Sequence, residues 1–492
     1  MKITKDLYQS SLSLLTDLYQ LTMAYGYWKS GMGDREAVFH LFFRKNPFQG
    51  GFAIACGLES IIDYLEGWKL QASDLAYLAT LHGNDGKPLF EPAFLEYLAQ
   101  MEFSCKIDAI PEGTAVFPHE PLVRVQGPII QCQIIETPLL NMINFQTLIA
   151  TKSARMNLAT RGESVLEFGL RRAQGIDGGL MASRAAYIGG CSATSNVLAG
   201  KLYDIPVRGT HAHSWVMSFD SELEAFETYA EHLPNNCVFL VDTFDTLEGV
   251  KKAVEVGKKL RARGFEMNGI RLDSGDLAYL SIKAREILDA GGFPHAAIVA
   301  SNDLDEHIIS SLKEQDAKIT VWGIGTKLVT AFDQPALGGV YKIAAIRNDE
   351  GEWDYKVKLS EQAIKVSNPG ILQVRRFKQD GEFAGDMIYN TAKALPEELV
   401  IVDPMDRTRR KKMLPDMEQQ DLLVPIFQNG QLIYQRPSIH DIRTRVPLEL
   451  DGFHSGIKRF MNPHEYPVGL EKTLSDDKYR IILRLRGEDE LD

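Results

Sequence analysis

The 492-residue sequence has few cysteines, and their arrangement excludes two common uses of this residue. The five cysteines are scattered along the chain, odd in number and without a CxxC pair. This spacing predicts neither a disulfide framework nor a zinc site. We therefore expect buried, reduced thiols in a cytoplasmic protein. The cysteines are Cys56, Cys105, Cys132, Cys191 and Cys237.

The sequence also lacks a positive charge excess and a long hydrophobic run. Its net charge is −12, so it has no basic field to attract nucleic acid or an anionic membrane surface. No segment reaches the roughly 18 apolar residues that a membrane span needs. Lys2 and Lys5 are followed by Asp6 and by serines and threonines, where a signal peptide would have an apolar core. An enzyme of this charge that binds anionic substrates must gather positive charge locally.

Hydrophobic periodicity divides the chain into three parts. Apolar residues at three- and four-residue steps predict an amphipathic helix over 12–30, and 37–44 reads as a strand. Residues 1–150 are therefore predicted to form an α+β domain. Over 151–350, short apolar runs alternate with helical patterns, which indicates parallel βαβ units. Residues 351–492 are expected to complete or decorate the first two domains.

Six of the apolar runs in the middle part are followed by polar, often glycine-rich loops. In a closed parallel barrel such loops meet on one face, and that face carries the active site. Loops after strands are commonly polar in any α/β protein, and a doubly wound open sheet is the rival fold. The predicted fold class is a parallel α/β barrel. The apolar runs are SVLEFGL, DIPVRG, CVFLVD, MNGIRL, AAIVAS, KITVWG and VYKIAA, and the loops are RRAQGIDGG, THAHS, TFDT, DSGD, NDLDE and GIGT.

The segment GTHAHSW contains two histidines, His211 and His213, which share a face if the segment is extended. They could form half of a metal site, but no further ligands stand at matching spacing, so no protein-only metal site is predicted. Either could instead be a buried structural histidine. In a loop rich in small donors, a histidine can also shuttle a proton or accept a phosphoryl group. The residues alone do not choose between the two.

The segment RLDSGDL places an arginine and two aspartates at another predicted strand end. The planar fork of Arg271 suits a carboxylate or a phosphate. Asp273 and Asp276 could hold ribose hydroxyls, or a magnesium ion carried in with a polyphosphate. The alternative interpretation is an ordinary arginine–aspartate salt bridge.

The segment GIGTKLVT is suited to a phosphate, because Gly325 and Thr326 allow backbone N–H groups and a hydroxyl to surround it. There is no GxxxxGK[ST] and no complete GxGxxG, so neither a P-loop NTPase nor a Rossmann dehydrogenase is supported. Arg171 and Lys152 supply positive charge, and Asn302 follows another strand. RTRRKK (407–412) is interpreted as a solvated basic turn.

Together these segments resemble the nicotinate phosphoribosyltransferase family. The resemblance runs from residue 16 to about 468 and includes the ordered motifs FGLRRAQGIDGG, GTHAHSW and RLDSGDL. The other matching segments are TDLYQLTM, FRKNPFQGGFAIACGL, PEGTAVFPHEPL, GIGTKLVT and NPHEYPV.

The resemblance implies transfer of phosphoribose from phosphoribosyl pyrophosphate to nicotinate, which yields nicotinate mononucleotide and pyrophosphate in NAD salvage. It further implies coupling to hydrolysis of ATP to ADP and phosphate through a transient phosphohistidine, with Mg²⁺ entering on the substrate phosphates. The expected fold is an irregular α/β barrel with an N-terminal α+β domain, in a homodimer with shared active sites.

The family motifs also assign roles to residues of this chain. By this resemblance His213 is the phosphorylated histidine, Tyr19 and Thr210 contact the pyridine, Arg271 binds its carboxylate, and Thr326 binds phosphoribosyl pyrophosphate. Tyr19, on the predicted N-terminal helix, is either a core residue or an aromatic platform for a flat ring.

Two alternative functions remain open at this point. A phosphoribosyltransferase of the same fold could prefer nicotinamide or quinolinate, although Arg271 favours a pyridine that carries a carboxylate. A non-catalytic relative could bind nucleotide, although the intact motifs argue against it. A metallohydrolase built on the two histidines of GTHAHSW is a more distant third.

Overall fold

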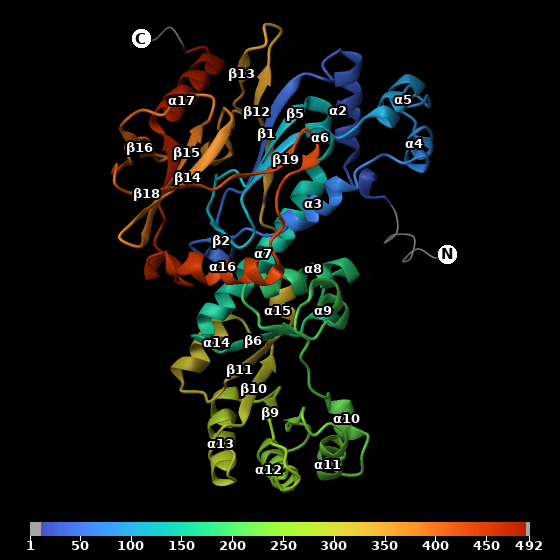
Figure 1. Cartoon of the computed structure of the whole chain (residues 1–492), viewed down its shortest axis with the longest axis vertical. Coiled ribbons are helices and arrows are strands. Elements are labelled where there is room, and N and C mark those ends of the chain that lie inside the picture. The colour runs from blue at the N-terminus through green and yellow to red at the C-terminus, as the bar shows by residue number, and fades with distance from the viewer. Residues whose placement is uncertain (1–10, 489–492) are drawn as a thin grey trace. The chain divides into compact units, whose positions relative to one another are not determined.

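The computed structural model describes residues 11–488, which divide into two compact units (Figure 1). The first unit comprises the chain up to Thr147, Ala336–Ser438 and the chain from Leu448 onward. The second comprises Leu148–Pro335 and Ile439–Pro447. Two of the boundaries fall within helices α7 (Glu136–Thr160) and α16 (Ile439–Asp451), one falls just before α16, and one falls between Pro335 and Ala336, outside any helix. No helix in the described part of the chain is long and apolar enough to cross a membrane.

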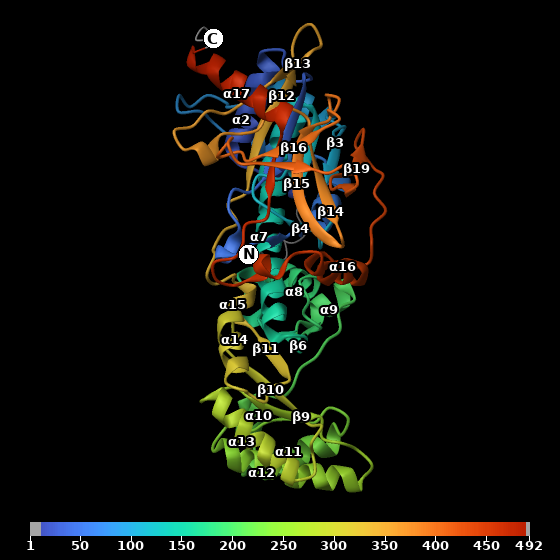
Figure 2. The same ribbon diagram turned by 90° about the vertical axis from the view of Figure 1, so that its left-hand side faces the viewer.

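A six-stranded, all-parallel sheet forms the centre of the second unit, with the strand order β7-β6-β11-β10-β9-β8. The predicted parallel α/β fold is confirmed. The strands β6, β11, β10 and β9 follow one another across the sheet in Figures 1 and 2. Their bounds are β6 Ser164–Glu167, β7 Ala193–Thr194, β8 Val238–Leu240, β9 Gly269–Leu272, β10 Ala297–Asn302 and β11 Val321–Ile324.

Helices connect these strands, and several begin at a polar residue of the loop that follows a strand. The Asp245 side chain accepts from the backbone N–H of Glu248 at the start of α12, and Asp276 accepts from that of Tyr279 at the start of α13. Such caps satisfy N–H groups that have no partner within the helix. Part of the polarity of these loops is therefore structural. The helices are α8 Gly175–Ile188, α9 Val197–Tyr203, α10 His213–Met217, α11 Glu222–His232, α12 Thr246–Ala262, α13 Leu277–Ala290, α14 Glu306–Glu314 and α15 Thr326–Val329.

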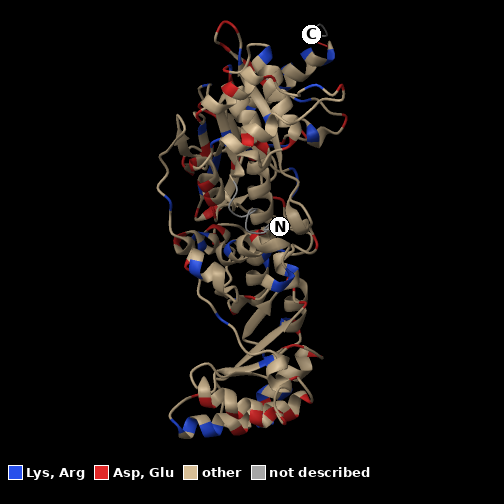
Figure 3. Cartoon of the chain, turned by 90° about the vertical axis from the view of Figure 1, so that its right-hand side faces the viewer, with Lys and Arg blue, Asp and Glu red and all other residues tan. Residues whose placement is uncertain are grey.

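Helix α12 shows how the sequence produces this layer. Val250, Ala253 and Leu260 recur at helical spacing and are buried, while its lysines and glutamates face outward. Helices α11, α12 and α13 pack side by side. In Figure 3 the ribbons of these outer helices are coloured in alternation for acidic and basic residues.

The parallel sheet almost closes into a barrel and stays open at one place. Val207 extends it beyond β7 through an isolated parallel bridge to Thr194. Segment 207–213 and strand β8 thus lie at opposite ends of the hydrogen-bonded order, although only α10 and α11 separate them in the chain. Within residues 11–488 no backbone hydrogen bond joins them. We call this opening the seam, and it makes the barrel irregular.

Two strand predictions in this region were wrong. DIPVRG forms only the bridge at Val207, whereas the short strand β7 was not predicted. VYKIAA was placed in the parallel series, but it forms β12 (Val340–Arg347) and pairs antiparallel with β1 (Glu36–Phe42) in the first unit. A short apolar run does not reveal its pairing partner, which lies about three hundred residues away in the chain.

Two larger sheets and a two-stranded sheet make up the first unit. One has the order β13-β12-β1-β5-β3-β19-β20, another the order β17-β16-β21-β15-β14-β18, and β2 pairs with β4. Strands β14, β15 and β16 are seen together in Figure 2. The remaining strands are β2 Ala53–Ile54, β3 Lys106–Ala109, β4 Ala115–Val116, β5 Val123–Pro128, β13 Trp353–Tyr355, β14 Leu372–Gln379, β15 Glu382–Asn390, β16 Leu399–Val402, β17 Arg410–Met413, β18 Glu418–Asp421, β19 Val424–Gln428, β20 Gln431–Leu432 and β21 Val468–Glu471.

The helices of the first unit include the predicted N-terminal helix, which is α2 and spans Leu18–Lys29. The predicted strand over 37–44 is β1. Residues after 350 contribute mainly to the first unit, and 439–447 contribute to the second. The remaining helices are α3 Leu58–Glu66, α4 Ala72–Leu78, α5 Pro92–Gln100, α6 Ile129–Ile134 and α17 Lys472–Arg486.

Candidate active site

The carboxyl ends of the parallel strands gather most of the predicted site residues at one edge of the second unit. Because the strands are parallel, the loops that follow them meet at that edge. Segment 207–213 ends there as well, since Val207 pairs in parallel with β7. The residues brought to this edge are Arg171, Thr210, His213, Asp242, Arg271, Asp273, Ser301, Asn302, Gly325 and Thr326.

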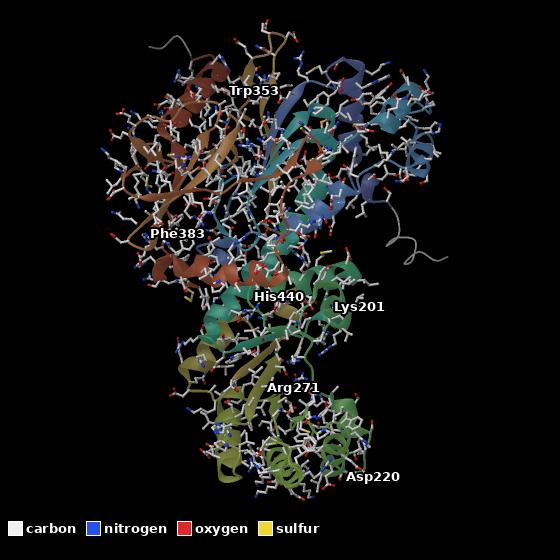
Figure 4. All side chains as sticks on the ribbon, viewed as in Figure 1. Lys201, Asp220, Arg271, Trp353, Phe383 and His440 are labelled. Carbon is white, nitrogen blue, oxygen red and sulfur yellow. The ribbon has the colours of Figure 1, made fainter. Side chains whose placement is uncertain are left out.

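Arg271, which is labelled in Figure 4, lies on β9. It is the centre of a hydrogen-bond network. Its Nε donates to Ser301 Oγ at 2.7 Å, one Nη donates to Thr210 Oγ1 at 3.1 Å, and the other donates to Asp273 Oδ1 at 2.8 Å. A guanidinium has five N–H donors, so among the contacts of residues 11–488 one N–H remains on each Nη. We call these two donors the Arg271 fork, because two N–H groups of one guanidinium suit a carboxylate. The arginine–aspartate salt bridge that the sequence suggested is present. It orients Arg271 and uses only part of its N–H donors.

Asp273 is held in its charged form by this network. Burial alone would raise the pKa of this carboxyl, but the Ser301 hydrogen bond and the positive charge of Arg271 outweigh it, so the pKa lies below its usual value. Ser301 and Arg271 both donate to Oδ1. Within residues 11–488, Oδ2 receives no hydrogen bond, which leaves an oxygen of the kind that Mg²⁺ prefers.

His213 is the first residue of α10 and faces a buried carboxylate. Its Nε2 lies 3.2 Å from Asp242 Oδ1; the His213 side chain is 41% exposed and that of Asp242 only 1%. The second oxygen of Asp242 accepts from the backbone N–H of Asp273 at 3.0 Å and from Ser274 Oγ at 2.6 Å. A continuous chain of contacts therefore runs from His213 through Asp242 and Asp273 to Arg271.

Two residues of this network, Asp242 and Ser301, were not predicted from the sequence. Each is at the end of an apolar run, Asp242 in CVFLVD and Ser301 in AAIVAS. A polar residue at the carboxyl end of a parallel strand is the signal that could have found them.

The structure separates the two histidines of GTHAHSW. The imidazole of His211 is buried beside Phe226, Tyr229 and Phe239, and its Nε2 accepts from the backbone N–H of Leu240 at 3.3 Å. This burial lowers the pKa of His211 to about 4, so the ring is neutral at pH 7. Because Nε2 of His211 already accepts an N–H group, the two rings do not form half of a metal site. Only His213 is open to a ligand.

Gly323, within β11, leaves room for an aromatic ring that lies beside Arg271. A Cβ on Gly323 would lie 2.8 Å from the Phe168 ring, so glycine is needed there. The ring in turn lies 5.7 Å from the Arg271 guanidinium. Gly325 precedes α15 and Thr326 is its first residue. We find the predicted phosphate-binding turn at the same edge as the arginine.

Four other predicted residues have structural partners or lie apart from the network. Asp276 caps α13. Asn302 ends β10 with a φ of 134°, a strained value for a residue other than glycine, and its Oδ1 accepts from the backbone N–H of Asp303. Arg171 is exposed in the 3₁₀ turn Leu170–Arg172. Tyr19 is on α2 in the first unit and is half exposed.

Lys152 differs from the other candidates because its charge is directed inward. The side chain is fully buried, and its Nζ lies 2.7 Å from Glu306 Oε2 and 2.8 Å from Asp333 Oδ2. Arg155 contacts the other oxygen of Glu306 at 2.8 Å. A substrate role for Lys152 stays a prediction, and the geometry supplies it with a structural role.

This fold and this edge define a class of protein. The strand ends of this parallel α/β barrel present an arginine fork, a glycine-rich turn and an exposed histidine that contacts a buried carboxylate. This arrangement is typical of barrel enzymes that bind phosphorylated substrates. Comparison with known families narrows this class. Residues 14–144, 158–360 and 373–478 match, respectively, the N-terminal domain, the family and the C-terminal domain descriptions of nicotinate phosphoribosyltransferase (NAPRTase). The chain belongs to the nicotinate phosphoribosyltransferase family.

Individual relatives are similar to this chain in sequence over nearly its full length. The chain is 46% identical over 489 residues to the nicotinate phosphoribosyltransferase of Bacillus subtilis, with 98% of each chain covered. It is 34% identical over 521 residues to the human enzyme of that name, with 94% of this chain and 95% of the human one covered.

Solved structures show the same fold. The crystal structure of human nicotinic acid phosphoribosyltransferase has a TM-score of 0.82 at 31% identity and covers 95% of this chain and 99% of its own. A nicotinate-nucleotide pyrophosphorylase from Pyrococcus furiosus has a TM-score of 0.69 at 22% identity, with 90% and 96% covered, and shares the fold.

Proposed function

We propose that this chain transfers phosphoribose from phosphoribosyl pyrophosphate to nicotinate in NAD salvage, and that it couples the transfer to ATP hydrolysis through phosphorylation of His213. The observation that carries the proposal is the joined network of Arg271, with two unused N–H donors, and the His213–Asp242 pair. Membership in the nicotinate phosphoribosyltransferase family supports the substrate pair.

The Arg271 fork selects the pyridine substrate. Its two remaining N–H groups bind the nicotinate carboxylate, because a bidentate charged pair is stronger than a bond to a neutral amide. The Thr210 hydroxyl, which accepts from Arg271, lies beside this fork. Phe168 offers a ring face next to it. By the family resemblance, Tyr19 contacts the same substrate, and a homodimer with shared sites remains part of the proposal.

Phosphoribosyl transfer needs positioning more than a protein nucleophile. The pyridine nitrogen forms a bond to ribose C1 while the bond from C1 to the pyrophosphate oxygen breaks, so positive charge develops on the sugar and negative charge on the departing pyrophosphate. Gly325 and Thr326 hold the phosphoribosyl substrate at the edge. Asp273 Oδ2 is the oxygen that would hold a Mg²⁺ ion arriving with the polyphosphate, and that ion neutralises charge on the leaving group.

The His213–Asp242 pair suits phosphoryl transfer from ATP. When Nε2–H of His213 donates to Asp242, the lone pair is on Nδ1. Nδ1 then attacks the γ-phosphorus, the bond to the ADP oxygen breaks, and the carboxylate of Asp242 stabilises the positive ring that forms. Water later releases phosphate and regenerates the free histidine.

A substrate comparison tests this function. The chain is incubated with phosphoribosyl pyrophosphate, Mg²⁺ and ATP, and with nicotinate, nicotinamide or quinolinate in turn, while mononucleotide, pyrophosphate and ADP are measured. We expect mononucleotide from nicotinate with at least ~100-fold preference over nicotinamide, because a lost charged pair in a closed site costs about 3 kcal/mol. Preference for nicotinamide or quinolinate, or the absence of pyrophosphate release with every substrate, would refute the proposal.

A further inference from the structure

Two side-chain contacts cross the seam in register. His211 Nε2 accepts from the backbone N–H of Leu240, and His213 Nε2 contacts Asp242 Oδ1. In each contact the two partners are 29 residues apart in the chain. Two residues that are two positions apart in segment 207–213 therefore contact two residues that are two positions apart in β8 and the chain that follows it. At the seam, these two side-chain contacts take the place of the backbone hydrogen bonds that join neighbouring strands elsewhere in the sheet.

The N–H group that His211 binds has no alternative partner in the sheet. Val241 N–H donates to the Arg271 carbonyl on β9 at 3.2 Å, so by the alternation of a strand the Leu240 N–H is directed to the opposite side, toward the seam. Leu240 is 1% exposed, so water does not replace the imidazole. Without an acceptor at position 211 this N–H is buried and unsatisfied, which native structures rarely tolerate.

The orientation of the His211 ring is set by its surroundings. Its centroid lies 6.0 Å from that of Phe226, 5.0 Å from that of Tyr229 and 6.5 Å from that of Phe239, and all three contacts are tilted. Phe226 and Tyr229 are on α11, and Phe239 is on β8. The ring is thus packed against α11 and β8, and its acceptor nitrogen faces Leu240.

We propose that His211 is a positioning residue that fixes the register of segment 207–213 against β8 and thereby holds His213 at Asp242. This inference rests on the proposed function, in which His213 accepts a phosphoryl group. A slip of one residue along an extended segment moves a side chain by about 3.3 Å and turns it to the other face. Such a slip removes the His213–Asp242 contact.

The two contacts differ in their response to turnover, which gives the His211 contact its importance. Phosphorylation adds between about −1.5 and −2 charges to His213 on the phosphoryl group, so the charges around its contact with Asp242 change during turnover. The contact between His211 and the Leu240 N–H is neutral and does not depend on these charges. His211 therefore retains the register through the phosphorylated state, so that His213 is at Asp242 again after phosphate release.

Three variants test the inference in the full-length chain. His211→Phe keeps a ring in the aromatic surroundings but removes the acceptor. His211→Gln restores an acceptor, its Oε1, without the ring. Tyr229→Phe is the matched control, since it changes a ring that packs on His211 and leaves the acceptor in place. Folding of each variant is checked by circular dichroism and thermal unfolding.

Two readouts are measured on each variant. The first is hydrogen exchange of the Leu240 amide, which reports the seam contact without any ATP chemistry. We expect it to accelerate at least ~10-fold in His211→Phe and to stay within about threefold of the original chain in His211→Gln and Tyr229→Phe. The second is the initial rate of phosphohistidine formation from ATP. It should fall at least ~10-fold in His211→Phe and recover to within about threefold in His211→Gln.

The outcomes separate this inference from the proposed function. If the unaltered chain forms no phosphohistidine, the proposed function fails, and the exchange of Leu240 still decides whether His211 holds the seam. If the unaltered chain is phosphorylated but folded His211→Phe exchanges and phosphorylates at the original rates, the inference is wrong. It is equally wrong if folded His211→Gln is as slow as His211→Phe in phosphohistidine formation, because then the acceptor is not what matters.

Discussion

Asp242 is the residue that gives His213 its chemistry in this account. It is almost completely buried, and both of its oxygens are used: one faces His213 and the other accepts from the Asp273 N–H and from Ser274. A buried carboxylate that fixes the tautomer and orientation of a histidine is a recurring device in nucleophilic catalysis. At the scale of single residues, the reactivity of His213 therefore depends on a neighbour that the motif GTHAHSW does not contain.

Replacement of this carboxylate tests the dependence. In Asp242→Asn the amide retains the shape but loses the charge that stabilises the phosphorylated ring, so we predict that the rate of phosphohistidine formation falls at least ~100-fold. The measurement is rapid-quench labelling with ATP. Asp245→Asn is the matched control, because Asp245 is three residues away and only caps α12. Equal rates in Asp242→Asn and in the original chain would exclude the assigned role.

For single residues, the sequence predicts which side chains lie at the strand-end edge better than it predicts the role of each side chain. Arg271, Thr210 and His213 are at the strand-end edge as expected from their motifs, because a polar residue after an apolar run is at the edge of a parallel sheet whatever its partners are. Asp276 and Lys152 have the charged groups that a substrate site needs, but both groups contact the protein itself. Asp276 caps a helix, and Lys152 forms a buried ion pair. Sequence spacing does not distinguish these uses, since each depends on which atoms lie opposite in three dimensions.

At the scale of elements, the buried ion pairs of Lys152 and Arg155 join α7 to α14. Glu306 at the start of α14 is fully buried and contacts both cations. Burial alone would raise the pKa of Glu306, but the charges of Lys152 and Arg155 lower it below its usual value. Helices α7 and α14 are thus joined by buried ion pairs. Removal of one charged side chain leaves its partner buried without a compensating charge.

Removal of the lysine should be costly to stability. We predict that Lys152→Ala lowers the free energy of unfolding by about 3–5 kcal/mol, measured by urea denaturation. Lys283→Ala is the matched control: Lys283 forms an exposed pair with Glu286 on α13, and its loss should leave the free energy of unfolding nearly unchanged. If Lys152→Ala unfolds like the original chain but raises the KM for phosphoribosyl pyrophosphate, then Lys152 is a substrate residue and the structural role is wrong.

The order of elements was predictable where strands and helices alternate, and unpredictable where pairing crosses long stretches of chain. Helices α12 and α13 are among the helices expected between the apolar runs, and they form there because their apolar periodicity and their aspartate caps are local signals. Strand β7 has only two residues and gives no periodic signal. Strand β12 reads like its parallel neighbours in sequence, but it joins an antiparallel sheet through residues at the start of the chain.

At the scale of the whole molecule, buried histidines in both units link stability to pH. Burial, with the charge of Arg124 adding to it, lowers the pKa of His40 to about 3, and burial lowers that of His119 and of His211 to about 4. His40 and His119 are in the first unit and His211 is in the second. In each case the unfolded chain binds a proton near pH 6.5 while the folded chain does not. The free energy of unfolding should therefore decrease as the pH falls from 6.5 toward 4.

His119 allows this linkage to be tested at one position. Its pKa shift corresponds to about 3 kcal/mol of stability lost between pH 6.5 and 4. Asparagine tolerates the φ of 70° at this residue, so we predict that His119→Asn keeps the fold and shows a smaller decrease in the free energy of unfolding over that range. His295→Asn, at an exposed histidine, is the matched control. An unchanged pH dependence in His119→Asn, by urea denaturation at each pH, would contradict the linkage.

If His213 accepts the γ-phosphoryl group of ATP, a labelled phosphate will be found at this residue. The chain is incubated with γ-labelled ATP and Mg²⁺, digested, and the labelled peptide is sequenced; His213→Asn is treated in parallel. We predict an acid-labile phosphate on His213 and no label in folded His213→Asn. A phosphate on another residue, or label that persists in His213→Asn, would contradict it.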